Sequence, residues 1–264
     1  YSDARHFVIN HLDLSKNSHT KANLIENLEK QKNTKLNKIL LRQYRVNLFF
    51  INKNNNALNK YKKNFNNNVL ILKYIHSSGG KDVIAFDSFD KFKKFIHLKI
   101  EEHKFKWKNL DYKTYDELDF SNKKKNYFIE WVLQKYITNP LLYKKKKFHL
   151  RIYFIYYRDK TKNKNRGFLV KNYGIATSEK NFKNSDYMNS KIHDSRFSST
   201  PYEINFYPDI SKNLSKYNID NIENQIELLF KFILKSLNID CFDNDDRCLK
   251  CFGADIMIDD NYNI

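Results

Sequence analysis

Residues 130–151 read EWVLQKYITNPLLYKKKKFHLR, and the rest of the chain is organised around this stretch. An apolar, strand-like run at 131–133 leads into Gln134 and Lys135, and a turn follows at 138–140. Four lysines at 144–147 then precede a second apolar run, 148–157, which contains His149 and Arg151. Cations inside or beside strands are costly to bury unless a partner neutralises them. The stretch therefore predicts a site for an anionic ligand.

The composition predicts a folded protein that prefers acidic partners. The 264 residues are 41% hydrophobic, and 48 Lys and Arg against 30 Asp and Glu give a formal net charge of +18. This apolar content suits one or two domains with a sizeable core, and no apolar run reaches the ~20 residues of a membrane span. The charge favours an acidic partner. Codon bias in an AT-rich genome would also enrich Lys and Asn, so charge alone does not identify that partner.

The three cysteines, Cys241, Cys248 and Cys251, favour a reducing compartment, because three thiols cannot pair fully. Cys248 and Cys251 have the spacing of half a zinc site. The chain supplies no second Cys/His pair to complete the usual four ligands, so we expect that these two cysteines do not bind zinc.

Apolar periodicity predicts a mixed α/β chain. Strand-like runs occur at 46–51, 69–72, 83–86, 167–170 and 251–260, and helical stripes occur at 24–28, 89–96 and 222–237. Residues 52–68 suggest a helix with loose ends, or else an Asn-rich insertion. Residues 100–126 and 176–216 are polar and predict irregular surface segments, the second of which is long enough to be functional or disordered.

Charged residues gather at the ends of the expected strands. Cations occur at Lys73, Lys81 and Lys135 as well as in the opening stretch, and Asp255 lies between Ala254 and Ile256 in an apolar run that disfavours a lone anion. A metal ion or a lysine would satisfy that carboxylate. Lysines around a triphosphate, with carboxylates that hold Mg²⁺, are what phosphoryl transfer requires. Residues 76–81, HSSGGK, form a glycine-containing loop that can donate backbone N–H groups to phosphates.

Several of these segments resemble signatures of the tubulin–tyrosine ligase family, whose fold is ATP-grasp. Residues 134–142, QKYITNPLL, and 147–151, KFHLR, resemble the central Q-K-Y-I-x-x-P-L-L and K-F-D-x-R motifs. Residues 69–83 are similar to W-I-L-K-P…G-K-G-I, and 252–259, FGADIMID, to F-G-x-D-x-M-x-D. Residues 10–12 and 21–28 are similar to the family's N-H-F…K-D-x-L-x-x-N-L segment.

The resemblance implies an α/β (α+β) chain of the ATP-grasp type, with mostly antiparallel sheets and flanking helices. It implies a partial N-terminal domain at 1–60, a central ATP-grasp subdomain at 61–133 and a C-terminal ATP-grasp subdomain at 134–264. We expect the last subdomain to be incomplete, because the family's closing E-x-N segment would follow Ile264.

The resemblance also implies an ATP-dependent carboxylate–amine ligase. ATP would phosphorylate a carboxylate of the acidic tubulin tail, and the amino group of free tyrosine or glutamate would attack the acyl phosphate. The residues implied for ATP are Lys73, Lys81, Gln134, Lys135, Tyr136, Ile137 and Asp194. Lys147, His149 and Arg151 would face the reacting groups, and Asp255 would bind Mg²⁺. The implied protein is cytoplasmic and microtubule-associated, with no nucleic-acid or membrane partner.

Two alternatives stay open. The family's K-F-D aspartate is His149 here, a family arginine for the incoming amino acid falls on Ala176, and residues 191–194, KIHD, stand where the family has H-L-T-N. These departures allow a degenerate member that binds tubulin or ATP without ligating. Lysines interleaved with Tyr and Phe also allow a basic nucleic-acid-binding domain. The aromatic residues, however, follow the apolar periodicity that is typical of a core.

Overall fold

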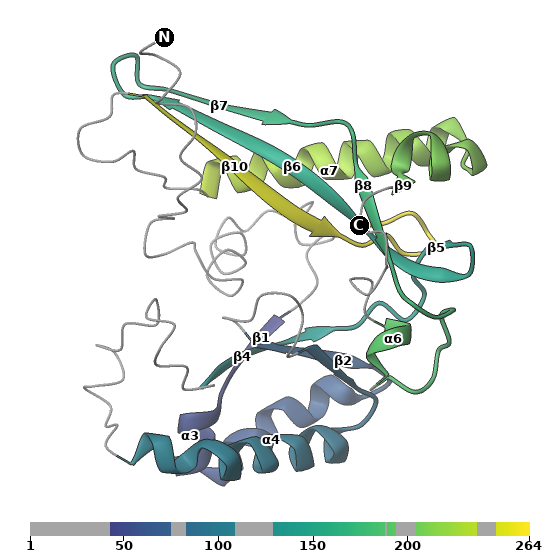
Figure 1. Cartoon of the computed structure of the whole chain (residues 1–264). Coiled ribbons are helices and arrows are strands. Elements are labelled where there is room, and N and C mark those ends of the chain that lie inside the picture. Colours follow the sequence, from purple (N-terminus) through teal and green to yellow (C-terminus); the bar gives the residue numbers. More distant parts are fainter. Residues whose placement is uncertain (1–42, 75–82, 109–128, 188, 194–203, 237–246) are drawn as a thin grey trace. The chain divides into compact units, whose positions relative to one another are not determined.

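The computed structural model describes residues 43–74, 83–108, 129–187, 189–193, 204–236 and 247–264 (Figure 1). These residues belong to two compact units, an N-terminal unit within Arg42–Tyr136 and a C-terminal unit within Ile137–Ile264. The chain thus passes from one unit to the other inside the QKYI segment. The domain boundaries expected from the sequence stay predictions.

The N-terminal unit is a four-stranded antiparallel sheet covered by helices on one face. Its strands follow the order β1 (Gln43–Asn47), β4 (Glu130–Lys135), β2 (Leu70–Tyr74) and β3 (Val83–Phe86). The covering elements are α3 (Leu48–Lys53), the 3₁₀ segment η2 (Asn55–Phe65), α4 (Phe89–His103) and η3 (Lys104–Trp107). In Figure 1, α3 and α4 lie together below this sheet.

Two features of the sequence favour helix α4, a capping residue at its start and an apolar stripe along one side. The Ser88 hydroxyl accepts a hydrogen bond from the Lys91 backbone N–H at 3.4 Å. The negative charge of Asp90 in the first turn interacts favourably with the positive end of the helix dipole. Phe92, Ile96 and Ile100 recur at intervals of four residues and are all buried. This confirms the predicted helix at 89–96 and extends it into the segment that we expected to be irregular.

The prediction of a strand at 46–51 is wrong for its second half. The strand β1 ends at Asn47, whose side-chain oxygen accepts a hydrogen bond from the Phe50 backbone N–H at 3.1 Å and so caps α3. Helix α3 buries Leu48, Phe49 and Ile51 in the core of this unit. Local capping chemistry therefore overrides the strand propensity of an apolar run.

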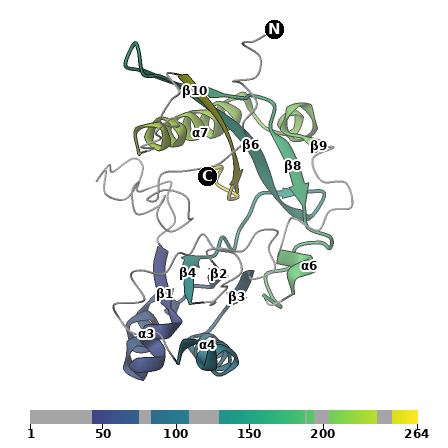
Figure 2. The same ribbon diagram turned by 60° about the vertical axis from the view of Figure 1, so that its left-hand side comes forward.

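The C-terminal unit is a six-stranded antiparallel sheet backed by one long helix. Strands β10 (Arg247–Ile256), β6 (Lys146–Asp159), β8 (Gly174–Thr177) and β9 (Ile204–Asn205) lie in this order, and β5 (Leu142–Tyr143) and β7 (Lys164–Leu169) also pair with β6. Helix α7 (Lys216–Ser236) runs along one face of the long strands (Figures 1 and 2), where Ile222, Ile226 and Phe230 enter the core. The mixed α/β architecture with antiparallel sheets is confirmed.

Residues 176–216 form more structure than their polar composition predicts. Besides the end of β8 and the whole of β9, they contain α6 (Ser190–His193), the π-helical turn η4 (Phe206–Ile210) and η5 (Ser211–Asn213). Phe206 and Ile210 anchor this region because both are buried in the core. The predicted last strand, 251–260, is also wrong in its bounds, since β10 spans Arg247–Ile256. None of the described helices combines the length and apolar character that a membrane crossing needs.

Candidate functional site

The side chains of strand β6 alternate between the buried core and the opposite face of the sheet. Its even-numbered residues 148–156 are buried in the core of the C-terminal unit. Successive side chains of a strand point to opposite faces, so Lys147, His149 and Arg151 share the other face of the sheet. Three of the side chains singled out by the sequence are therefore brought together on one strand, away from the core.

The carboxylate of Asp255 lies among these side chains. Asp255 on β10 pairs directly with Arg151 on β6. The Arg151 Nε lies 2.9 Å from Asp255 Oδ1, and the Arg151 Nη2 donates a hydrogen bond to Oδ2 at 3.4 Å. The His149 Nε2 lies 3.3 Å from the same Oδ1. The imidazole is 5% exposed while the carboxylate is 45% exposed, so the negative end of this cluster remains open to solvent.

Small residues flank Arg151 on both neighbouring strands. Gly174 on β8 stands opposite Arg151, and Ala176 stands opposite His149. Gly253 on β10 stands opposite Tyr153, two pairs along from the pair of Arg151 with Asp255. A Cβ atom on Gly253 would lie 2.7 Å from the Arg151 Nη1. A larger residue at 253 would therefore require the guanidinium to shift from its position across β10.

Lys147 is 3% exposed, which is unusual for a lysine and indicates that the surrounding residues hold its side chain in place. Its backbone carbonyl accepts a hydrogen bond from the Ser178 N–H at 2.7 Å, which joins β6 to the chain just beyond β8. Helix α6 contacts β6 here and carries His193, which is also buried. Lys147 thus lies at the end of the Arg151 cluster nearest to α6.

The nucleotide residues expected in the N-terminal unit include one clear pair. The Lys73 Nζ donates a hydrogen bond to the Gln134 Oε1 at 2.8 Å, from β2 to β4. Both lie on the sheet face opposite the core, together with the buried Val132 and Ala85. An ammonium group and an amide on an apolar sheet face can hold the phosphates and the base of a nucleotide.

The remaining residues of the QKYI segment differ in their environment. Lys135 is exposed, whereas the Tyr136 side chain is buried and its backbone N–H bonds to the Val69 carbonyl at 2.9 Å. Ile137 is half-buried. Lys81 and Asp194, the other two residues expected to contact ATP, lie outside the described residues.

Asp255 suits part of a Mg²⁺ site. The part of the chain that the structure describes holds no group of three or more His, Cys, Asp and Glu side chains that could bind a metal by themselves. Mg²⁺ in nucleotide sites is commonly held by one or two carboxylates, with phosphates and water as its other ligands. The exposed carboxylate of Asp255 fits that limited role, although His149 and Arg151 already engage its oxygens.

His193 is a buried residue of this region that the sequence did not single out on its own. Its ring stacks on Tyr187 at a centroid distance of 5.2 Å and meets the edge of Phe182 at 5.7 Å, and Nε2 lies 3.0 Å from the Ser185 carbonyl. Burial lowers the pKa of His193, and the positive charge of Lys147 lowers it further, although the Ser185 carbonyl partly opposes them. The aromatic residues at 182 and 187 were the sequence signal for this enclosure.

We expect the neutral form of His193 to make stability depend on pH. Because its folded pKa lies below the ordinary value of about 6.5, the unfolded state binds more protons below that pH. The contribution is complete above pH ~6.5 and is lost as the pH falls further. His193→Gln should therefore flatten the fall in melting temperature between pH 7.5 and 5.5. Equal slopes in the variant and the unmodified protein would contradict this.

Comparisons with known proteins bear on the family and the fold of the chain. The model of the Tubulin-tyrosine ligase family matches residues 2–193. Tubulin glycylase 3C of Tetrahymena thermophila is 29% identical over 154 residues, which are 51% of this chain and 14% of that protein. A solved structure, the C-terminal domain from K. lactis Pby1, is described as an ATP-grasp enzyme interacting with the mRNA decapping enzyme Dcp2. It is similar at a TM-score of 0.54 and 18% identity, over 91% of this chain and 61% of that chain. This likeness shows the ATP-grasp fold, and the chain spans less than two thirds of either relative.

Proposed function

The chain belongs to the tubulin–tyrosine ligase family, and from this membership we propose that it is part of an ATP-dependent ligase that adds an amino acid to acidic tubulin tails. The observation that carries the proposal is the single face of β6 on which Lys147, His149 and Arg151 lie beside the Asp255 carboxylate. A face with this charge suits a reaction in which anionic phosphate and carboxylate groups must meet.

The proposed reaction has two steps. A carboxylate oxygen of the tubulin tail attacks the γ-phosphorus of ATP, the bond from that phosphorus to the bridging oxygen breaks, and ADP leaves. The amino group of the free amino acid then attacks the acyl carbon, inorganic phosphate leaves, and the nitrogen loses a proton as the amide forms. Lys147 and Arg151 would offset the negative charge that gathers on the transferring phosphoryl group. Their positions are fixed by burial and by Asp255, so little reorganisation is required.

The proposal gives the other residues supporting roles. Lys73 and Lys81 would bind the phosphates of ATP, and Gln134, Lys135, Tyr136, Ile137 and Asp194 would contact the rest of the nucleotide. Asp255 would contribute one ligand to Mg²⁺, which neutralises phosphate charge when bound. His149 lies 3.3 Å from Asp255 and would orient that carboxylate together with Arg151.

Separate observations support the proposed acceptor and the candidates for the added amino acid. A formal net charge of +18 favours the approach of a glutamate-rich tail at low salt. The family resemblance favours tyrosine or glutamate as the added amino acid, and the similarity to a protein named tubulin glycylase adds glycine to the candidates. We propose a cytoplasmic, microtubule-associated protein on the same grounds.

We expect the full-length protein to incorporate labelled amino acid into tubulin when ATP and Mg²⁺ are both supplied. Tyrosine, glutamate and glycine should be tested separately, on microtubules with and without their acidic tails. Incorporation should require the tails and should be accompanied by release of ADP and phosphate in equal amounts. ATP binding without incorporation of any of the three would contradict the proposal.

A second candidate function is binding without ligation. It is favoured by His149, which stands where the family motif has an aspartate and which contacts Asp255, so the cluster holds one carboxylate instead of two. In that case the full-length protein would bind ATP or tubulin, yet would release no ADP when tails and amino acids are added. Measurable turnover would exclude this candidate.

A further inference from the structure

The face of the C-terminal sheet opposite α7 continues past the Arg151 cluster. Arg151 and Tyr153 are two residues apart on β6, so their side chains point to the same side of the sheet. A Cβ atom on Gly253 would lie 2.7 Å from the Arg151 Nη1 and 3.6 Å from the Tyr153 Cε1, so both side chains reach the same position on β10. The surface that carries the proposed chemistry therefore leads along β6 toward its hairpin with β7 (Figures 1 and 2).

Strand β7 widens this surface with two cations and an aromatic ring. Its register places Lys164, Arg166 and Phe168 opposite the odd-numbered residues 155–159 of β6. Residues directly opposite each other in an antiparallel pair point to the same face, so these three side chains lie on the side of the sheet away from the core. Gly167 between them faces the core, where an added Cβ atom would lie 2.7 Å from a buried phenylalanine ring.

Two large side chains on this surface are open to solvent. Tyr153 is 44% exposed and Phe168 is 50% exposed. The Val170 N–H donates a hydrogen bond to the Tyr153 carbonyl at 3.0 Å, which sets Phe168 diagonally across from Tyr153. Diagonal neighbours in an antiparallel pair are within reach of aromatic side chains. With Lys164 and Arg166 these two residues form one continuous surface, which we call the hairpin face.

The hairpin face is positively charged. Lys164 and Arg166 are exposed, and among the residues that the structure describes neither has a carboxylate within ion-pair distance. The carboxylate opposite Lys164 on β6 belongs to Asp159, which is 3% exposed. It accepts a hydrogen bond from the Thr161 hydroxyl at 2.6 Å, and the Arg247 Nε lies 3.5 Å from its Oδ2. Asp159 is thus engaged elsewhere, and both cations are available to an anion outside the chain.

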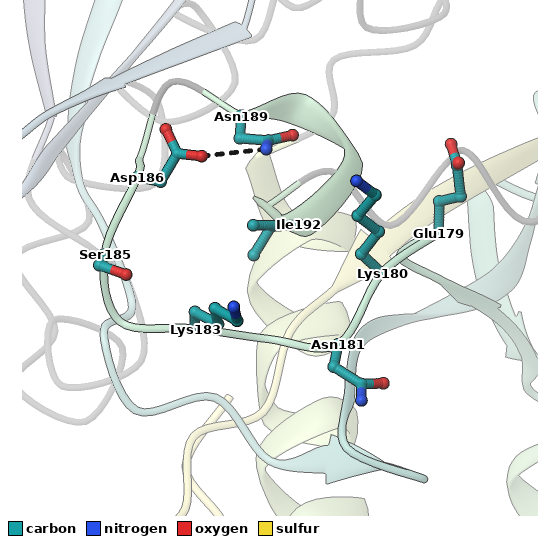
Figure 3. Close-up of a pocket in the computed structure, with 8 residues that line it drawn as sticks. All are labelled: Glu179, Lys180, Asn181, Lys183, Ser185, Asp186, Asn189 and Ile192. Atoms are coloured by element: carbon teal, nitrogen blue, oxygen red, sulfur yellow. Dashed lines mark hydrogen bonds between the residues drawn. The ribbon is translucent and has the colours of Figure 1, made fainter.

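The polar pocket of the same unit is less suited to an acidic partner. This pocket, of about 550 Å³, lies in the loop after β8, and the carboxylates of Glu179 and Asp186 are among the side chains that line it (Figure 3). They would repel further negative charge. The hairpin face, in contrast, consists of two cations and two aromatic side chains.

We propose that the hairpin face binds an acidic polypeptide segment in an extended conformation, with carboxylates of the segment at Lys164 and Arg166 and its aliphatic groups against Tyr153 and Phe168. Opposite charges on the two partners favour this pairing, and exposed aromatic rings supply apolar contact area. The assignment rests on the proposed ligase function and extends it, because the acceptor chain would be recognised at a place separate from its reacting carboxylate.

The spacing along β6 sets the length of acceptor that this site requires. Tyr157, which pairs with Arg166, is about six residues from Arg151, or about 20 Å at ~3.3 Å per residue. An extended acceptor whose reacting carboxylate lies at Arg151 therefore reaches the two cations only with roughly six or more residues beyond the modified position.

The first test compares the double variant Lys164→Ala/Arg166→Ala with Lys231→Ala/Lys235→Ala in the full-length protein. The second pair removes the same charge from exposed positions on α7, at the other side of the sheet. The hairpin variant should raise the KM for the tubulin acceptor about tenfold at low salt and leave the KM for ATP unchanged. The increase should shrink at high salt, because exposed ion pairs are screened. Acceptor peptides with fewer than about six residues beyond the modified carboxylate should show the same KM in the hairpin variant and the unmodified protein.

Binding of poly-L-glutamate without ATP separates this docking site from the proposed ligase function. At low salt the hairpin variant should bind poly-L-glutamate about tenfold more weakly than the unmodified protein, whereas the α7 variant should bind it equally well. If this loss occurs in a protein that ligates nothing, the docking site is supported and the ligase function is not. If ligation proceeds with an unchanged acceptor KM in the hairpin variant, or if that variant binds poly-L-glutamate normally, the docking site is overturned. A variant that loses binding of single-stranded RNA but keeps poly-L-glutamate would overturn it as well.

Discussion

Replacing Arg151 with alanine should lower the kcat/KM for ligation about a hundredfold to a thousandfold, the loss that follows removal of one preorganised donor from a developing anion. The Arg151 Nε lies 2.9 Å from the Asp255 Oδ1, which holds the guanidinium in a fixed position on the face that carries Lys147. Arg151→Lys should recover only part of the activity, because an ammonium group lacks the planar fork that bonds two oxygens at once. The measurement is amide formation and ADP release by the full-length protein.

The same two strands supply the control. Arg247 on β10 lies 3.5 Å from Asp159 on β6, which makes it a second cross-strand Arg–Asp pair far from the proposed site. Arg247→Ala removes a guanidinium from the same sheet and should leave kcat/KM within about twofold, as expected for an exposed residue outside the site. Equal losses in the two variants would mean that Arg151 matters only for the sheet.

Phe92→Ala should destabilise the N-terminal unit by about 3–5 kcal/mol, the cost of truncating a fully buried aromatic side chain. Phe92 is 0% exposed, and its ring lies 5.3 Å from Phe65, 5.8 Å from Phe86 and 6.0 Å from Tyr61. Loss of this ring should speed hydrogen–deuterium exchange of the β2 and β4 amides. Those strands hold Lys73 and Gln134, so the affinity for ATP should fall with it.

Substitution of Phe105, an exposed aromatic residue of the same unit, is the matched control for Phe92→Ala. It follows α4 in η3 and is 59% exposed, so Phe105→Ala creates no cavity and should change stability by about 0.5 kcal/mol or less. Comparable exchange in the two variants would show that the aromatic cluster around Phe92 is not the core of this unit.

The sequence predicted the parts of the fold that depend on local pattern. The stripe of Phe92, Ile96 and Ile100 and the alternation of β6 follow directly from periodicity, because burial selects apolar residues at fixed spacing. The end of β1 at Asn47 was missed, since a side-chain cap competes with an apolar run that is too short to distinguish strand from helix. The pairing of Arg151 with Asp255 could not be predicted from spacing, because it joins residues 104 apart through sheet register.

The candidate site was predictable only where a motif marked it. Lys73 and Gln134 came from recognisable segments and are hydrogen-bonded to each other. His193 belongs to a polar stretch whose composition is that of any exposed loop. Its enclosure by Phe182 and Tyr187 depends on where the backbone returns.

The ten-residue pairing of β10 with β6 also limits how this site can diversify. A slip of one residue would break both Arg–Asp pairs together and would turn the face that carries His149 into the core, because strand side chains alternate with a period of two. The strands are thus held in a single alignment. New substrate preferences in proteins with this arrangement should therefore arise by exchange of individual side chains or by remodelling of the loop after β8, and not by sliding of one strand along the other.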